Sequence, residues 1–173
     1  MIRPMEPGRH PIKITAPMLR DIDLFKDVDE TLLTALVEEL VVRQAATGEM
    51  VMREKDPAGA MFLVIAGELE VLKHGQSGNE VRVAMFGPGD WFGEMAILDV
   101  QPRSASVRAV APTILLHVGP DDMEKLLERD LRAYAMIMRN IARELSRRLR
   151  VADGILAHLV ARVTDEYVRP SRK

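Results

Sequence analysis

The sequence has no cysteine, few aromatic residues and no long apolar run. The absence of cysteine excludes disulfides, thiolate zinc sites, iron–sulfur clusters and cysteine nucleophiles together. Because no apolar stretch approaches the roughly 20 residues of a membrane span, we expect no transmembrane helix and no membrane partner. The N-terminus also lacks the continuous apolar block of a secretory signal, so a reducing cytoplasm is the expected compartment.

An excess of charge of either sign is also missing. The 24 Lys and Arg residues nearly balance 26 Asp and Glu residues, which gives a formal net charge of −2. Without a strong positive field, we expect no direct DNA binding. The 173 residues are 47% apolar and 29% charged, which is typical of one soluble globular domain with a core of its own.

Catalytic and metal-binding patterns are absent as well. The four histidines form neither an HxH nor an HExxH pair, and no Ser-His-Asp order is visible. A metal-dependent cupin would be the main enzymatic rival among β folds, but His74 and His117 are too sparse to supply its ligands. We therefore predict a protein that is not an enzyme and holds no metal, and a small β-barrel enzyme remains the weakest alternative.

The character of the chain changes twice along its length. Residues 1–17 contain four prolines and are predicted to form an extended or disordered arm. From residue 18 the apolar spacing is helical, and Asp29 predicts the N-cap of a second helix. Short alternating runs then predict strands separated by glycine-rich turns, with a hairpin loop at 75–79. These runs are 41–46, 49–54, 60–67, 68–75, 80–87, 104–110 and 113–118.

After Pro120 the helical pattern returns. An apolar stripe with heptad spacing runs from Tyr134 to Val163, longer than a surface helix of a small domain needs. We interpret its later part as the seam of a symmetric homodimer. The predicted organisation is therefore an α+β fold, a β-roll or jelly-roll barrel flanked by N-terminal helices and a long C-terminal helix. Its parts are an arm (1–17), a β-roll domain with flanking helices (18–130), a long lid and dimerisation helix (131–163) and a tail (164–173).

One segment carries binding chemistry. Gly93 allows close approach to the backbone, and the N–H groups of the turn that follows it can hold an anion. Arg103 supplies a planar charged fork that suits a phosphate, and Glu94 is an acceptor that suits a sugar hydroxyl. Ser104 can donate a further hydrogen bond, and Ala105 is small enough for close contact. The sequence therefore places acceptors for a ribose beside donors for a phosphate.

This segment resembles the phosphate-binding cassette of the cyclic nucleotide-binding domain family, which includes the bacterial catabolite activator protein, cAMP-dependent kinase regulatory subunits and cyclic-nucleotide-gated channels. The matching residues are Phe92-Gly93-Glu94-Met95-Ala96-Ile97-Leu98 and Pro102-Arg103-Ser104-Ala105-Ser106-Val107. The resemblance covers roughly residues 19–150. Only ten residues follow Val163, too few for a helix-turn-helix, whereas the initial methionine and the arm favour a whole protein over a fragment.

The resemblance implies a role for each matching residue. Glu94 would accept the ribose 2′-hydroxyl, and Arg103 would pair with the cyclic phosphate. Ser104 and backbone N–H groups near Ala96 and Ala105 would complete the phosphate cradle. Met95 lies in the 93–98 turn, whose N–H groups can hold an anion. The purine would lie against Val71 and Val83, under a helical lid where Arg148 (or Arg147) meets the base.

We therefore predict a regulatory module that binds a cyclic purine nucleotide, with cAMP favoured over cGMP. Binding would rearrange the C-terminal helix, and an unidentified protein partner would read that helix or the N-terminal arm. The alternative is a constitutive dimeric interaction module whose pocket is vestigial and binds nothing.

Overall fold

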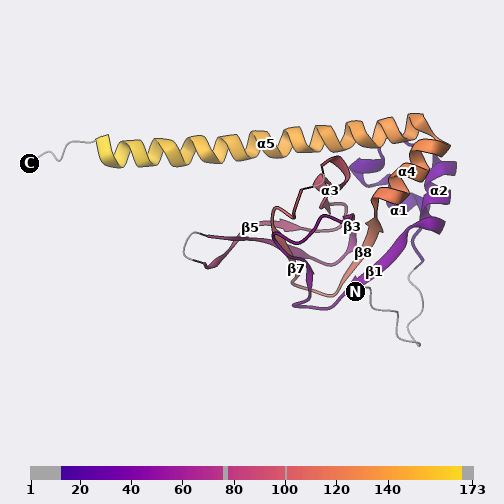
Figure 1. The fold of residues 1–173 in the computed structure, drawn as a ribbon, viewed down its shortest axis with the longest axis horizontal. Helices are drawn as coiled ribbons and strands as arrows, with labels where there is room; N and C mark the ends of the chain where they lie inside the picture. The colour runs from indigo at the N-terminus through magenta and orange to yellow at the C-terminus, as the bar shows by residue number, and fades with distance from the viewer. Residues whose placement is uncertain (1–12, 76–77, 100, 169–173) are drawn as a thin grey trace, which may run out of the picture.

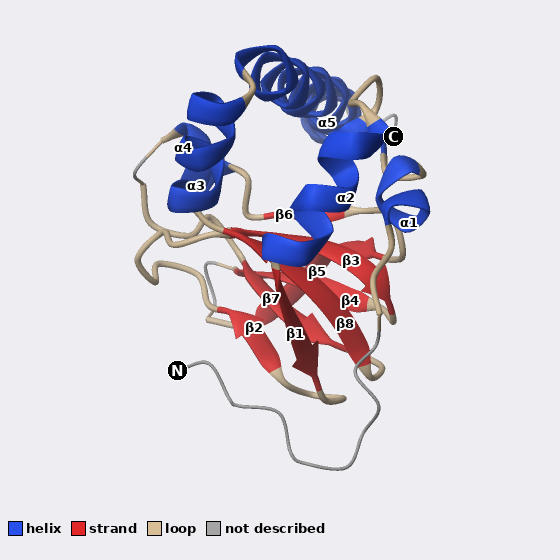
Figure 2. Cartoon of the chain, turned by 90° about the vertical axis from the view of Figure 1, so that its right-hand side faces the viewer, coloured by secondary structure: helices blue, strands red, loops and turns tan. Residues whose placement is uncertain are grey.

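Two antiparallel sheets of four strands form the body of the protein, and helices cover one end (Figures 1 and 2). The structure is a computed structural model, which describes residues 13–75, 78–99 and 101–168. The first sheet has the order β1 (Val41–Ala45), β8 (Thr113–Val118), β3 (Met61–Ala66) and β6 (Trp91–Phe92). The second has the order β2 (Met50–Met52), β7 (Ser106–Ala109), β4 (Leu69–His74) and β5 (Glu80–Phe86). The predicted jelly-roll class is confirmed.

Strand β3 lies between two cores. Its side chains alternate, so Phe62 and Val64 face the second sheet, whereas Met61 and Leu63 pack against the helices. All four are buried, which explains why this strand reads as a continuous apolar run. The barrel interior and the helical layer are therefore joined through one strand.

The first N-terminal helix begins earlier than predicted. Helix α1 (Ala16–Arg20) accommodates Pro17 in its first turn, where a missing N–H costs no hydrogen bond, and Ile14 and Ala16 are buried in the core. The prediction of an extended arm over 1–17 is therefore wrong for its last residues, and residues 1–12 lie outside the described part of the chain. A 3₁₀ turn, η1 (Asp23–Phe25), and helix α2 (Glu30–Glu39) follow.

The predicted N-cap at Asp29 is confirmed. Its carboxylate accepts the Thr31 N–H at 2.8 Å, which satisfies one donor in the first turn of α2. Helix α4 (Pro120–Arg129) begins in a related way, because Asp122 accepts the Gly119 N–H at 2.8 Å. Both helices therefore start where the sequence places a short acidic side chain.

Helix α5 (Leu131–Val168) is the longest element and runs along the helical end and out past the barrel (Figure 1). It continues beyond residue 163, so the predicted boundary between helix and tail is wrong, because nothing in residues 164–168 interrupts helical hydrogen bonding. Residues 169–173 and the hairpin residues 76–77 lie outside the described residues. Among the described helices, none combines the length and the apolar content that crossing a bilayer requires.

The two halves of α5 have different surroundings. In the first half Ala133, Ile137 and Ile141 are buried, and Asn140 donates to the carbonyls of Leu24 and Lys26 at 3.0 Å. From Leu149 onward every described side chain is exposed. The first half is thus fixed to the domain, and the second half presents an apolar face without a partner within the described residues.

Candidate functional site

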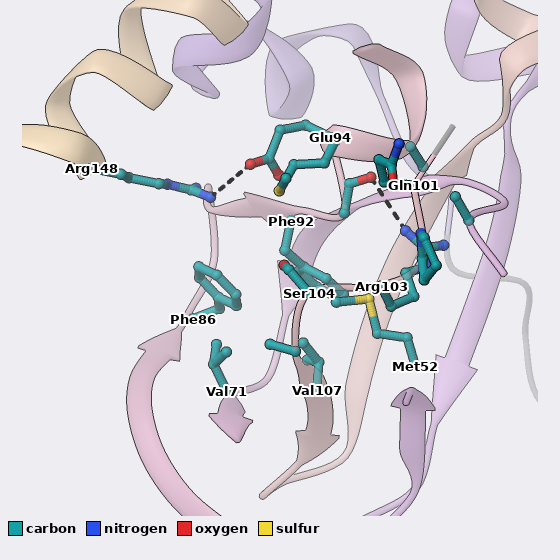
Figure 3. Close-up of a pocket in the computed structure, with 16 residues that line it drawn as sticks. Met52, Val71, Phe86, Phe92, Glu94, Gln101, Arg103, Ser104, Val107 and Arg148 are labelled. Carbon is teal, nitrogen blue, oxygen red and sulfur yellow. Dashed lines mark hydrogen bonds and ion pairs between the residues drawn. The ribbon is translucent and has the colours of Figure 1, made fainter. Parts of the chain in front are cut away.

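A cavity of about 150 Å³ lies between the second sheet, the short helix α3 (Met95–Leu98) and helix α5 (Figure 3). The structure brings together at this cavity all of the sequence-predicted site residues except Val83. These residues are Val71, Gly93, Glu94, Met95, Ala96, Arg103, Ser104, Ala105 and Arg148. Residues far apart in the chain therefore converge on one space.

Gly93 shapes one wall of the cavity. It has a φ of +79°, and a Cβ atom there would lie 2.8 Å from Arg103 Nη1 and 2.9 Å from the Ala60 carbonyl oxygen. Only glycine fits this position without displacing the guanidinium. The Ala96 N–H donates to the Gly93 carbonyl at 3.1 Å, so in this structure that donor belongs to the α3 turn.

Arg103 is held through its backbone and leaves its side chain available. Its N–H donates to the Asp56 carbonyl, and its carbonyl accepts the Lys55 N–H, both at 2.9 Å. Nη1 donates to the Gly93 carbonyl at 3.3 Å (Figure 3). Partial burial lowers the pKa of Arg103, while Asp56 and Glu94 act in the opposite direction. The result is a half-buried cation whose side chain donates only to Gly93 among the described residues, which suits an anion.

Glu94 lies elsewhere on the cavity wall and contacts the long helix. Its side chain is 7% exposed, and Oε1 lies 3.3 Å from Arg148 Nη1. Arg148 also donates to the Trp91 carbonyl at 2.8 Å and lies over the Phe86 ring, 5.5 Å from its centroid. Figure 3 shows Arg148 reaching from α5 to the mouth of the cavity. In this structure, Arg148 of α5 therefore contacts the carboxylate of Glu94, which was predicted to accept a ribose hydroxyl.

The prediction that Val83 lines the site is wrong. Val71 pairs with Ala84 across β4 and β5, so Ala84 shares the inward face with Val71 and Val83 points outward. Val83 is 57% exposed. A register shift between Val71 and Leu72 offsets the pairing, and the sequence alone does not reveal it.

Several apolar residues at the cavity were not predicted. Phe86 pairs with Leu69 on the inward face and stacks on Phe92, with ring centroids 5.3 Å apart. The period-2 alternation that identified Val71 would have identified Phe86 once the hairpin register was known. Met52, Phe92, Gln101, Pro102 and Val107 also line the cavity.

A polar cluster lies behind the cavity at the end of β4. The Glu54 carboxylate accepts the His74 N–H at 3.1 Å and lies 3.0 Å from His74 Nδ1. Its other oxygen lies 3.3 Å from Lys73 Nζ. These contacts, led by the His74 side chain, lower the pKa of Glu54 to about 2.

This lowered pKa predicts a difference in acid stability. Glu54 is expected to stabilise the fold fully above its ordinary pKa of 4.5, and this contribution disappears as the pH falls toward about 2. Glu54→Gln should therefore have a lower free energy of unfolding than the wild type at about pH 6, and this difference should narrow by about pH 3. Urea unfolding of both proteins at each pH measures the difference. A difference that does not depend on pH would contradict the lowered pKa of Glu54.

Comparison with known proteins decides the family. The sequence profile for the Cyclic nucleotide-binding domain matches residues 42–130, which span nearly all of the barrel and every cavity-lining residue except Arg148. The chain belongs to this family. The cyclic nucleotide-binding domain described here is also 37% identical over 106 residues to the Cyclic AMP receptor protein of Thermus thermophilus, covering 61% of this chain and 47% of that protein.

Two further similarities extend this result. A cAMP-dependent protein kinase regulatory subunit of Emericella nidulans is 32% identical over 109 residues, 63% of this chain and 26% of that protein. The crystal structure of the Thermus thermophilus catabolite activator protein superposes with a TM-score of 0.71 at 32% identity, over 80% of this chain and 63% of that chain. The cyclic nucleotide-binding domain thus matches 47% of the length of the Thermus thermophilus Cyclic AMP receptor protein and 26% of the Emericella nidulans subunit.

Proposed function

We propose that this domain is a cAMP sensor that regulates a partner through helix α5. The observation that carries the proposal is the cavity itself. The buried acceptor Glu94, the half-buried cation Arg103 and several apolar side chains line this one cavity. A cyclic purine nucleotide offers a ribose hydroxyl, an anionic phosphate and an apolar base, which match these three features.

Each group has a role in this proposal. Arg103 pairs with the cyclic phosphate, and Ser104 and the Ala105 N–H add donors. Glu94 accepts the ribose 2′-hydroxyl. Val71 contacts the purine, and Phe86 and Arg148 extend that surface. The names of relatives from Thermus thermophilus and Emericella nidulans mention cyclic AMP, which supports cAMP over cGMP.

Binding is coupled to α5 through Arg148. The cavity of about 150 Å³ is smaller than the roughly 300–1,000 Å³ of ordinary small-molecule sites, and Arg148 lies at its mouth. A nucleotide that reaches Glu94 must displace or share the Arg148 contact. Ligand binding is therefore expected to shift the docking of α5.

Arg148→Met tests this coupling. The variant should still bind cAMP, within about tenfold of the wild type, because Glu94 and Arg103 remain. We expect nucleotide to change the amide exchange of residues 131–148 in the wild type, and Arg148→Met should lose this change. An unchanged exchange response in the variant would show that the coupling does not pass through Arg148.

Two copies associate through the second half of α5 in this proposal. Four exposed apolar residues there belong to the heptad stripe, namely Leu149, Leu156, Leu159 and Val163, and such a face is stabilised by a matching helix. A protein partner that responds to cAMP would then read the paired helices or the N-terminal arm.

Calorimetric titration with cAMP, cGMP and a cyclic dinucleotide tests the function directly. We expect saturable binding, with cAMP tightest. If the folded protein binds none of the three, the pocket is vestigial, and the domain is an interaction module instead.

A further inference from the structure

The three residues that follow Pro102, Arg103–Ala105, form a short segment that is called the phosphate segment here. The residues after β2 pair with it, because Arg103 exchanges backbone hydrogen bonds with Lys55 and Asp56 at 2.9 Å. Just beyond the phosphate segment, the Glu54 N–H donates to Ser106 Oγ at 2.9 Å. These contacts fix both ends of the phosphate segment and leave the Ser104 carbonyl to accept a hydrogen bond from another group.

Lys73 supplies that group. Its ammonium Nζ lies 2.5 Å from the Ser104 carbonyl oxygen and 3.3 Å from Glu54 Oε1. Glu54 is in turn held by His74, and its side chain is only 14% exposed. The partly buried Glu54 carboxylate and the Ser104 carbonyl therefore hold the Lys73 ammonium between them.

The Ser104 carbonyl and the Ala105 N–H belong to one peptide plane. No described peptide bond is cis, so the two groups point in opposite directions. Ala105 lines the cavity, whereas Lys73 does not. With the carbonyl held toward Lys73, the N–H is directed toward the cavity, and within the described residues it donates to no protein acceptor.

We propose that Lys73 is a positioning residue for the phosphate. It fixes the Ser104–Ala105 peptide so that the Ala105 N–H faces the bound anion, and its charge polarises that peptide toward stronger donation. Glu54 holds Lys73 in place. This inference rests on the proposed function, because the acceptor is the cyclic phosphate, and it assigns to Lys73 an effect on an anion that it does not touch.

The test compares the wild type with Lys73→Met and Lys73→Arg in cAMP titrations. Lys73→Met keeps the length of the side chain and removes its charge; it should weaken cAMP binding about tenfold, the effect of one lost charge-assisted hydrogen bond. Lys73→Arg should recover most of this loss. Arg82→Met, which removes an exposed charge from the adjacent strand β5, is the matched control and should bind like the wild type.

The two phosphorothioate diastereomers of cAMP separate positioning from general damage. Each replaces one exocyclic phosphate oxygen with sulfur, a weak acceptor. For the diastereomer whose sulfur faces the Ala105 N–H, Lys73→Met should lower the binding affinity by less than about threefold. For the other diastereomer, Lys73→Met should lower the affinity about tenfold, as it does for cAMP. Thermal unfolding of each variant shows whether it is folded.

Each outcome addresses a different statement. If the wild type binds no cyclic nucleotide, the proposed function fails. If the wild type binds and Lys73→Met binds equally well, the inference about Lys73 is wrong. An equal loss for both diastereomers overturns it too, because Lys73 would then support the fold in general. If Lys73→Met does not fold, Glu54→Gln is used in the same comparison and should show the same dependence on the diastereomer.

Discussion

Replacing Arg103 with alanine is expected to weaken cAMP binding by at least about 100-fold while leaving the protein folded. A hydrogen bond to a charged group contributes roughly 1.5–3 kcal/mol, and a bidentate guanidinium makes two. At about 1.4 kcal/mol per decade, the loss exceeds two decades. The fold should survive, because the Arg103 side chain donates within the described residues only to Gly93, and its backbone contacts do not depend on the side chain.

Two further variants make this result specific. Arg103→Lys should also bind weakly, because a point charge cannot reproduce the planar fork. Arg53→Ala removes the same charge from an exposed position after β2 and should retain wild-type affinity. A folded Arg103→Ala protein that binds cAMP within about threefold of the wild type would refute the assignment of the phosphate site.

Leu156→Glu is expected to convert the proposed dimer into monomers. Leu156 is 59% exposed in the single chain and lies in the middle of the exposed part of the heptad stripe, Leu149 to Val163. Burying a leucine contributes about 1.5–3 kcal/mol, and a symmetric seam contains it twice. The loss is therefore about 3 kcal/mol or more, over 100-fold in the dissociation constant, before the repulsion between two carboxylates is added. Light scattering at micromolar concentration measures the mass.

Ala157→Glu is the matched control for this experiment. Residue 157 is exposed on the side of α5 away from the stripe, and the change adds the same single charge. It should leave the dimer intact. A wild-type protein that is monomeric with and without cAMP would contradict the proposed seam.

Local patterns predicted most of the fold. The alternation and the glycine spacing located the strands, and β8 begins and ends at Thr113 and Val118 as predicted. The acidic residue Asp29 located the start of α2. These features succeed because a strand or a cap depends on neighbours within a few residues.

The site was less predictable where it depends on pairing between distant segments. Whether Val83 or Phe86 faces the cavity depends on a register shift opposite β4, which no local pattern encodes. The contact of Lys73 with the Ser104 carbonyl joins residues 31 apart in the chain. Glu94 and Arg103 could be predicted because their spacing matches a family pattern. Lys73 and Glu54, which contact the segment that contains Arg103, belong to no such pattern.

If cAMP binding displaces Arg148 from Glu94, as proposed above, the nucleotide site and the long helix are thermodynamically linked. If cAMP favours one arrangement of α5, then any event that favours the same arrangement tightens cAMP binding by the same factor. In the proposed dimer, pairing of two chains through the second half of α5 is expected to be such an event. Nucleotide affinity should then depend on the concentration of the protein itself. The response to a given cAMP concentration would therefore change with the amount of the protein present.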